Sequence, residues 1–276
     1  MTIEKSDQPD AFLKFEHEGW ETNSSGYERH FSDLTGQVVG PTLDAAGVEA
    51  GMRVLDVCTG PGMLARGAAG RGATAVGLDF AEQAVAAARQ RIPETEFVQG
   101  DAQALPFEDE SFDAVVCGYG IIHVPDPEAA LAEMRRVLRA GGRVAASVWE
   151  APGPSNGFGV LFGALKAHGD MSVPLPHGPD FFQFSDHARM AAALAETGFS
   201  DVETLTAPQT LHMDDPLGLI TAIVEGAVRA RALYLAQADD ARAAIDASVR
   251  EGMARFPAVG HGYAVPMPAI IGSGAK

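Results

Sequence analysis

A regular alternation of short apolar runs and helical segments between residues 53 and 149 constrains the fold most strongly. Strands are predicted at 53–58, 73–79, 95–99, 112–117 and 143–149, and helices between them at 63–70, 82–91 and 127–138. Several of the strands are apolar on both faces, so helices must cover the sheet on both sides. Right-handed crossovers between parallel strands then predict a doubly wound α/β fold.

The flanking regions have a different character. Residues 12–46 show apolar side chains at roughly helical spacing, which predicts an N-terminal helical lid after a frayed tail. Beyond Glu150 the pattern predicts helices at 158–166, 185–198, 216–237 and 239–256, and strands at 201–206 and 263–271. Ser185 is expected as an N-cap and Gly198 as a helix stop. Pro266 and Pro268 would confine the last strand to an edge of the sheet.

Three consecutive segments are therefore expected. They are a tail and lid at 1–46, a cofactor-binding core at 47–150, and a part at 151–276 that completes the sheet. The last part carries a helical insertion at 216–256, before the final strand. A length of 276 residues suits one large domain with such elaborations.

Composition and net charge restrict the classes of partner that this protein is expected to bind. The formal net charge is −17, from 37 acidic against 20 basic residues, and such a surface repels nucleic acid. Two cysteines without a CxxC pair fit a reducing cytoplasm, and the eight histidines match no metal-binding spacing, so no metal is expected. We found neither a secretory signal nor an apolar run of membrane-spanning length, so we expect a cytoplasmic protein without membrane insertion. The sequence carries no signal for or against a homodimer.

Residues at the carboxyl ends of the predicted strands should share one ligand-binding crevice. These residues are Asp56, Cys58 and the turn Thr59-Gly60-Pro61-Gly62 after the first strand, Asp79-Phe80 after the second, Gly100-Asp101-Ala102 after the third, and Cys117-Gly118-Tyr119 with His123 after the fourth. The crevice thus gathers three aspartates and no lysine or arginine. This charge predicts a cationic ligand.

The glycine turn by itself is ambiguous. Residues 60–65 satisfy the loose pattern G-x-G-x-x-A of dinucleotide-binding proteins. A pyrophosphate would be repelled by Asp56, whereas the ammonium and sulfonium groups of S-adenosylmethionine would be attracted. At ~4 Å and an effective dielectric constant near 20, one charge pair contributes about 4 kcal/mol before desolvation. The sign of this interaction favours S-adenosylmethionine, whose ribose suits Asp79 and whose adenine amine suits Asp101.

Residues 52–150 resemble the class I S-adenosylmethionine-dependent methyltransferases, in particular those of ubiquinone and menaquinone biosynthesis and their small-molecule relatives. The motifs that carry the resemblance, in order, are VLDVCTGPG, AVGLDFAEQAV, GDAQALPFEDESFDAVVC and IIHVPDPEAALAEMRRVLRAGGRVAASVWE. The resemblance implies a mostly parallel, seven-stranded, Rossmann-like methyltransferase sheet with an antiparallel edge strand. It covers the chain before and after this segment only loosely.

The resemblance also implies roles for the glycine turn and its neighbours. Gly60 and Gly62 would let the backbone approach the cofactor, and Asp56 would orient its methionine amino end through water. Asp79 would accept hydrogen bonds from both ribose hydroxyls. Asp101 would accept from the adenine amine, while the Ala102 amide reaches the ring and the Cys117 carbonyl accepts from the ammonium. Three neighbouring residues, Pro61, Phe80 and Gly118, complete the expected cofactor-binding set.

Each of these residues also has a structural interpretation. Asp79 could be a helix N-cap, Asp101 a turn residue, and Asp56 a structural acid. Cys58 stands where the family usually has glycine, and Thr59 where it usually has cysteine, which tightens the turn. The Cys58 and Cys117 thiols should approach each other, either as small packing groups under the cofactor or in a redox role.

Two residues are candidates for the reaction itself. His123 could act as a general base near the methyl acceptor, or could be a helix-start histidine bonded to backbone. Tyr27, with Trp20 and Phe31, could close over the cofactor with its hydroxyl near the sulfonium, or could simply pack in a core. The aromatic residues Phe181, Phe182 and Phe184 and the helices at 216–256 would either roof the acceptor pocket or pack on the sheet.

The sequence therefore predicts an S-adenosylmethionine-dependent methyltransferase that acts on a small, partly apolar organic acceptor by direct in-line transfer, with S-adenosylhomocysteine as product. A sulfonium is an activated donor, so alignment of donor and acceptor supplies much of the rate, about 7–11 kcal/mol in favourable cases. Two alternatives stay open at this point. They are a non-catalytic S-adenosylmethionine-binding regulatory module and an NAD(P)-dependent oxidoreductase.

Overall fold

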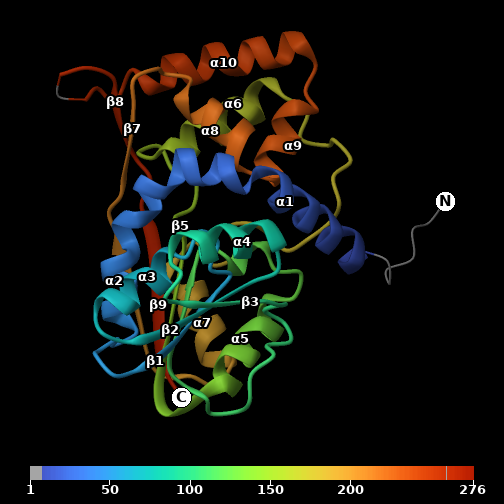
Figure 1. The fold of residues 1–276 in the computed structure, drawn as a ribbon. Coiled ribbons are helices and arrows are strands. Elements are labelled where there is room, and N and C mark those ends of the chain that lie inside the picture. Colours follow the sequence, from blue (N-terminus) through green and yellow to red (C-terminus); the bar gives the residue numbers. More distant parts are fainter. Residues whose placement is uncertain (1–7, 259) are drawn as a thin grey trace. The chain divides into compact units, whose positions relative to one another are not determined.

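The computed structural model describes residues 8–258 and 260–276, which fall into two compact units (Figure 1). The sheet unit comprises Gly36–Trp149, Gly178–Ala207 and Ala269–Lys276. The helical unit comprises the described residues up to Thr35 together with Glu150–His177 and Pro208–Pro268. Each unit thus gathers stretches that are distant in sequence, whereas the sequence had been divided into three consecutive segments.

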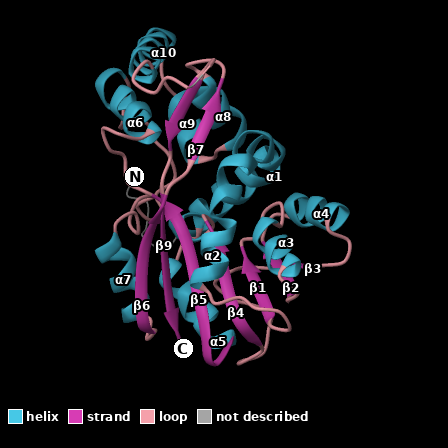
Figure 2. Ribbon diagram, turned by 90° about the vertical axis from the view of Figure 1, so that its left-hand side faces the viewer, coloured by secondary structure: helices cyan, strands magenta, loops and turns pink. Residues whose placement is uncertain are grey.

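The sheet unit is built on seven strands in the order β3-β2-β1-β4-β5-β9-β6 (Figure 2). Their bounds are Arg53–Val57 (β1), Thr74–Asp79 (β2), Glu96–Gln99 (β3), Phe112–Gly118 (β4), Leu138–Trp149 (β5), Ser200–Ala207 (β6) and Ala269–Ala275 (β9). Strands β1 to β5 pair in parallel, and β9 is antiparallel to both of its neighbours. This confirms the predicted doubly wound, mostly parallel sheet. The strand order reverses between β1 and β4, where ligands bind in sheets of this kind.

The predicted edge position of the antiparallel strand was wrong. Strand β9 lies between β5 and β6, and β6 forms the edge. The segment predicted as one strand forms two strands, β8 and β9. Pro266 and Pro268 both come before β9 begins, so β9 contains no proline. The residues Tyr263–Pro266 form β8, which pairs with β7 (Thr210–Met213) in a separate sheet of the helical unit. Free of proline, β9 can donate backbone hydrogen bonds to neighbours on both sides.

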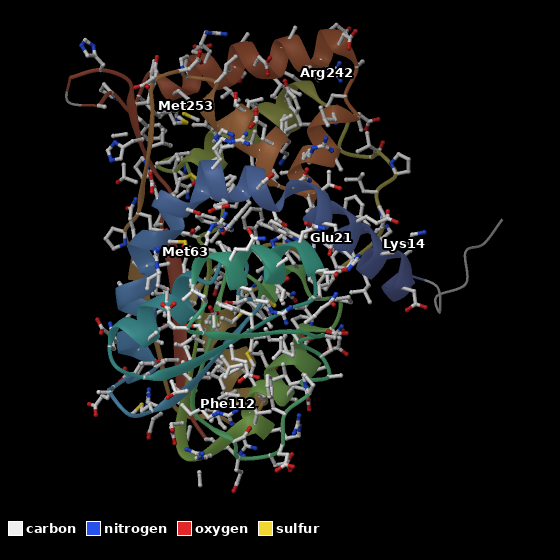
Figure 3. The ribbon with its side chains drawn as sticks, viewed as in Figure 1. Lys14, Glu21, Met63, Phe112, Arg242 and Met253 are labelled. Atoms are coloured by element: carbon white, nitrogen blue, oxygen red, sulfur yellow. The ribbon has the colours of Figure 1, made fainter. Side chains whose placement is uncertain are left out.

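Helices cover both faces of the main sheet. On one face, α2 (Val39–Ala45), α3 (Met63–Gly70) and α4 (Glu82–Arg91) enclose a buried apolar cluster with residues of β1, β2, β4 and β5, including Ala145. On the other face, α7 (His187–Glu196) packs against Gly272, which pairs with Ala146. Helix α5 (Pro127–Val137) joins β4 to β5. Phe112, labelled in Figure 3, is fully buried where β4 begins.

Helix α7 begins one residue later than the sequence analysis predicted. The expected N-cap Ser185 was wrong, because the Asp186 side chain accepts a hydrogen bond from the Arg189 amide at 2.8 Å and caps the helix. The predicted stop at Gly198 is confirmed. Its φ of +95° lies in the left-handed region, where glycine meets no steric penalty.

The helical unit contains α1 (Gln8–Thr35), α6 (Gly157–His168), α8 (Gly218–Gly226), α9 (Arg229–Leu235) and α10 (Asp239–Met253), besides β7 and β8. The helix predicted at 216–237 is two helices, because the chain becomes extended at Ala227. Helix α1 packs closely on α8, since a Cβ at Gly26 would lie only 1.9 Å from the Glu225 carbonyl oxygen. No helix among the described residues is long and apolar enough to cross a membrane.

Candidate functional site

The glycine turn follows β1 and leads directly into α3. The Thr59 amide donates to the Leu78 carbonyl at 2.9 Å, which ties the turn to β2. Gly60 and Gly62 have φ values of +51° and +81°, in the left-handed region. A Cβ at Gly62 would lie 2.8 Å from Ile92, whereas one at Gly60 would meet nothing within 4 Å. Gly62 is therefore required for packing, and the space beside Gly60 leaves the backbone open to a ligand.

Asp56 is buried at the end of β1, beneath the turn. Its Oδ2 accepts hydrogen bonds from the Thr59 hydroxyl at 2.6 Å and from the Ala65 amide at 2.9 Å. Ala65 is the third residue of α3, so the carboxylate caps this helix from outside its own sequence. Burial raises the pKa of Asp56 to about 7, and the charge of Asp79 adds to this, while the two hydrogen bonds act in the opposite direction.

Asp79 ends β2 and faces the same turn. Its Oδ2 accepts a hydrogen bond from the Gly60 amide at 2.8 Å, and its Oδ1 accepts one from the Ala81 amide at 3.0 Å. Asp79 is not the N-cap of α4, because Ala81 occupies that position. A carboxylate offers about four acceptor positions. Bonding to these amides is thus compatible with accepting the hydroxyls of a ribose.

The segment after β3 is organised around Asp101. The carboxylate accepts from the Gln103 backbone amide at 2.8 Å and from the Gln103 side chain at 3.0 Å. This is the arrangement of a turn, and it leaves Asp101 only partly buried beside the buried Ala102. Phe80, which follows Asp79, accepts a hydrogen bond through its carbonyl from the Gln99 side chain. These residues therefore follow the ends of β2 and β3, which pair with each other.

Cys117 and Gly118 end β4, next to β1. Cys117 is fully buried, and a Cβ at Gly118 would lie 3.0 Å from Leu64 of α3. Cys58 is partly exposed and has a φ of +56°, which is unusual for a residue with a side chain. A hydrogen bond with Cys117 and burial raise the pKa of the Cys58 thiol well above its usual range. The expectation that the two thiols meet is confirmed.

His123 lies just beyond β4, in a short 3-10 turn at Ile121–His123. Its amide donates to the Gly120 carbonyl at 2.9 Å. Its ring meets Phe181 edge-on, with 5.6 Å between the centroids. Both residues belong to the sheet unit. The side chain thus has an aromatic neighbour from the loop that was expected to roof the acceptor.

Tyr119 was expected in the crevice without a role of its own, and Trp149 was not expected there. Their rings stack with 4.2 Å between the centroids, at the ends of neighbouring strands β4 and β5. Tyr119 is buried and has a φ of +60°, which is rare for a bulky residue and marks local strain. The position of Tyr119 directly after Cys117-Gly118 was visible in the sequence. Its strained backbone and its partner were not.

Tyr27 belongs to the helical unit and is described within that unit alone. Its ring stacks on Phe31 and meets Trp20 edge-on, so these three aromatic residues form one cluster on α1. Burial raises the pKa of Tyr27 to about 12, although a hydrogen bond with Thr35 lowers it. Its phenol is therefore protonated at neutral pH. The helices of residues 216–256 also belong to the helical unit, and their part in an acceptor pocket stays a prediction.

Comparisons with known proteins found relatives of this chain among methyltransferases. A family described as a methyltransferase domain matches residues 55–146. The demethylmenaquinone methyltransferase of Renibacterium salmoninarum is 37% identical over 169 residues, which cover 58% of this chain and 71% of that protein. The corresponding protein of Beutenbergia cavernae is 43% identical over 173 residues, with the same coverage.

Solved structures show the same fold. The YcgJ protein from Bacillus subtilis has a TM-score of 0.57 at 22% identity, covering 86% of this chain and 97% of that one. A phosphoethanolamine N-methyltransferase from Haemonchus contortus, solved with phosphomonomethylethanolamine and S-adenosylhomocysteine, also has a TM-score of 0.57, at 19% identity. It covers 96% of this chain and 60% of that one.

Proposed function

Because this chain belongs to the class I S-adenosylmethionine-dependent methyltransferases of the menaquinone and ubiquinone type, we propose that it methylates a small, partly apolar acceptor by direct in-line transfer. It is an enzyme, and S-adenosylmethionine is its cofactor.

The carboxylates around the glycine turn are the main support for the cofactor-binding residues. Asp79 accepts a hydrogen bond from the Gly60 amide. A Cβ at Gly60 would meet nothing within 4 Å, so a ligand can lie against this part of the backbone. We assign the ribose hydroxyls to Asp79 and the adenine amine to Asp101, with Ala102 and Phe80 beside the ring. Asp56 and the Cys117 carbonyl, with Gly118 after it, would face the cationic methionine end. Gly60, Pro61 and Gly62 would supply the backbone approach.

The N-terminus of α3 argues against a nicotinamide cofactor. In dinucleotide-binding folds the pyrophosphate lies at the N-terminus of this first helix. Here the Asp56 carboxyl group accepts a hydrogen bond from the Ala65 amide, at the place where a pyrophosphate would lie. A pyrophosphate would displace the acid or lie against it.

The bound cofactor supplies a methyl group on a positively charged sulfur, which makes the group ready for transfer. The residues of this chain would then align the acceptor, exclude water and hold protons. We assign His123 to remove a proton from the acceptor, since a neutral imidazole can act as a base near neutral pH. The phenol of Tyr27 is protonated at neutral pH, so it would orient the acceptor through hydrogen bonds and would not act as a base.

Aromatic side chains beyond β4 and β5 support a partly apolar acceptor. The Tyr119–Trp149 stack and the His123–Phe181 contact lie at the carboxyl ends of strands in the sheet unit, where ligands of such folds bind. Phe182 meets Phe181 edge-on and extends the same loop, followed by the buried Phe184. Flat rings such as those of phenols and quinols would pack well against Phe181 and Phe182, which are partly exposed. The two relatives compared above are named for demethylmenaquinone, which carries a quinone ring.

The first experiment is a thermal melt with S-adenosylmethionine, S-adenosylhomocysteine or NADH. A ligand at a hundred times its dissociation constant adds about 2.7 kcal/mol, or roughly 5–10 °C for a domain of this size. We expect a rise with the first two compounds and none with NADH. A rise with NADH alone would contradict the assignment of the site.

The second experiment measures transfer of labelled methyl groups to phenols, quinols and hydroxylated aromatics. Transfer to at least one of them, reduced about 10²-fold or more in a His123→Ala variant that still binds the cofactor, is the expected result. Tight cofactor binding without transfer to any acceptor would favour a non-catalytic regulatory module instead.

A further inference from the structure

We propose that Cys58 and Cys117 form an oxidisable dithiol, and that its disulfide ties the glycine turn to the end of β4 and weakens the binding of S-adenosylmethionine. The second part rests on the assignment of the glycine turn to the cofactor. The first part depends only on the positions of the two sulfur atoms.

Strand pairing brings the two cysteines together. Strands β1 and β4 are parallel neighbours, with Asp56 opposite Val116 in the last registered pair. Cys117 follows Val116 within β4, and Cys58 follows β1. Both sulfurs lie close to one point, because a Cβ at Gly120 would be 2.8 Å from the Cys58 Sγ and 3.3 Å from the Cys117 Sγ. The two thiols therefore face the same space beside Gly120.

Gly120 makes the room for this contact. A Cβ at Gly120 would lie 2.1 Å from the Cys58 Cβ, so no other residue type fits without displacing Cys58. Cys58 itself holds a left-handed backbone conformation in which glycine is the easier residue. The chain thus carries a strained cysteine in the glycine turn and a glycine opposite it. As a result, the thiol lies beside Cys117.

The two thiols differ in access and therefore in role. Cys58 is partly exposed as a residue whereas Cys117 is fully buried, so Cys58 is the first of the two that an oxidant would reach. Around Cys58 lie Cys117 from β4, Asp79 from β2 and Asp56 from β1, and all three raise its pKa. The thiolate is the reactive form. Oxidation should therefore be slow at neutral pH and faster in alkaline solution.

The chemistry is a two-electron thiol–disulfide exchange with a small disulfide such as oxidised glutathione. The Cys58 thiolate attacks one sulfur of the oxidant, forms a mixed disulfide and releases one glutathione thiolate. The Cys117 thiolate then attacks the Cys58 sulfur and releases the second glutathione. The protein dithiol is oxidised, the oxidant is reduced to two thiols, and these take up the two protons.

The disulfide would draw the turn toward β4. An S–S bond of about 2.05 Å is shorter than any contact between two free thiols. Closing this gap would shift the turn that carries Cys58, and the Gly60 amide bonded to Asp79 belongs to the same turn. The cofactor-binding geometry proposed above would then be lost.

The test is to incubate the reduced protein with oxidised glutathione at pH 7 and pH 9. Intact mass, peptide mapping and calorimetry with S-adenosylmethionine are then recorded. We expect a loss of about 2 Da, a peptide that joins the two cysteines, faster reaction at pH 9, and a weaker affinity that dithiothreitol restores.

Two variants separate the steps, each compared with its own reduced form. Cys117→Ser should stop at the mixed disulfide, with a gain of about 305 Da. Cys58→Gly should neither gain nor lose mass, and its affinity should not respond to the oxidant. If both thiols stay free in the wild type at pH 9, the dithiol proposal is overturned. If the disulfide forms and affinity is unchanged, its effect on the cofactor is overturned. If the reduced wild type fails to bind S-adenosylmethionine, the proposed binding site itself is wrong, while the mass data still decide the disulfide.

Discussion

The Oδ2 atom of Asp56 accepts a hydrogen bond from the Ala65 amide at 2.9 Å, and so an acid of β1 caps the helix that follows the glycine turn. The same oxygen accepts from Thr59 within the turn. An acid that stabilises a helix N-terminus from this position also takes the place in which other glycine turns hold a phosphate. This explains why an aspartate can precede such a turn.

Stability should depend on pH through Asp56. Its pKa is about 7 in the folded protein, above the value near 3.8 of an exposed aspartate. The folded state therefore binds more protons than the unfolded state between these values. The contribution of Asp56 to stability falls as pH rises through this window, by at most about 1.4 kcal/mol per pH unit.

An Asp56→Asn variant keeps an acceptor oxygen and loses the titration. We expect its free energy of unfolding to increase relative to that of the wild type as pH rises from 5 to 8, because ionisation of Asp56 destabilises only the wild type. Urea unfolding of both proteins at pH 5, 6, 7 and 8 measures the difference, in which the other titrating groups largely cancel. If the unfolding free energies of the two proteins changed in parallel with pH, the pKa of Asp56 would not be raised in the folded protein.

Replacement of Asp79 should weaken cofactor binding. Asp79→Ala removes hydrogen bonds to a charged group, which should cost about 1.5–3 kcal/mol of S-adenosylmethionine affinity by calorimetry. Asp44→Ala is the matched control, because this acid of α2 has an exposed side chain that pairs with Arg71 on the surface. Equal S-adenosylmethionine affinities for the two variants would mean that Asp79 does not bind the cofactor.

Gly62 should tolerate no side chain. Gly62→Ala places a Cβ 2.8 Å from Ile92 and 3.0 Å from Phe97, at a φ of +81°. We expect a loss of about 1–3 kcal/mol of unfolding free energy in urea titrations. Gly70→Ala, at the other end of α3, meets nothing within 4 Å and should be neutral or stabilising by up to about 1 kcal/mol. Similar losses in both would indicate that helix α3, rather than the turn, is sensitive.

The helical unit should depend on a buried ion pair. Glu16 is fully buried, lies 2.8 Å from Arg229 and accepts from the Trp20 indole at 3.2 Å. Glu16→Ala leaves the guanidinium without this partner, so the free energy of unfolding should fall by about 3–5 kcal/mol. The neighbouring exposed pair gives the control, since Lys14→Ala should change stability by less than about 1 kcal/mol. Calorimetric melts of both variants test this. A small loss of unfolding free energy in Glu16→Ala would show that the ion pair contributes little to stability.

The sequence by itself determined the sheet and the list of candidate residues. Apolar runs separated by helical segments fixed five strands, because a strand buried on both faces has few other solutions. Asp56, Asp79 and Cys117 could be assigned to one edge of the sheet, because parallel strands align their carboxyl ends. Cys58 and Cys117 could be expected to meet for the same reason.

Tertiary structure decided what depends on partners distant in the chain. The place of β9 between β5 and β6 depends on its pairing with strands distant in the chain, and the local pattern of 263–271 does not contain this information. The helix cap from Asp56, the raised pKa of that acid and the strained stack of Tyr119 on Trp149 all arise from burial and long-range contacts. Sequence periodicity reports which face of an element is apolar. It does not report which side chain the folded chain brings against that face, because that choice is made by packing the whole unit.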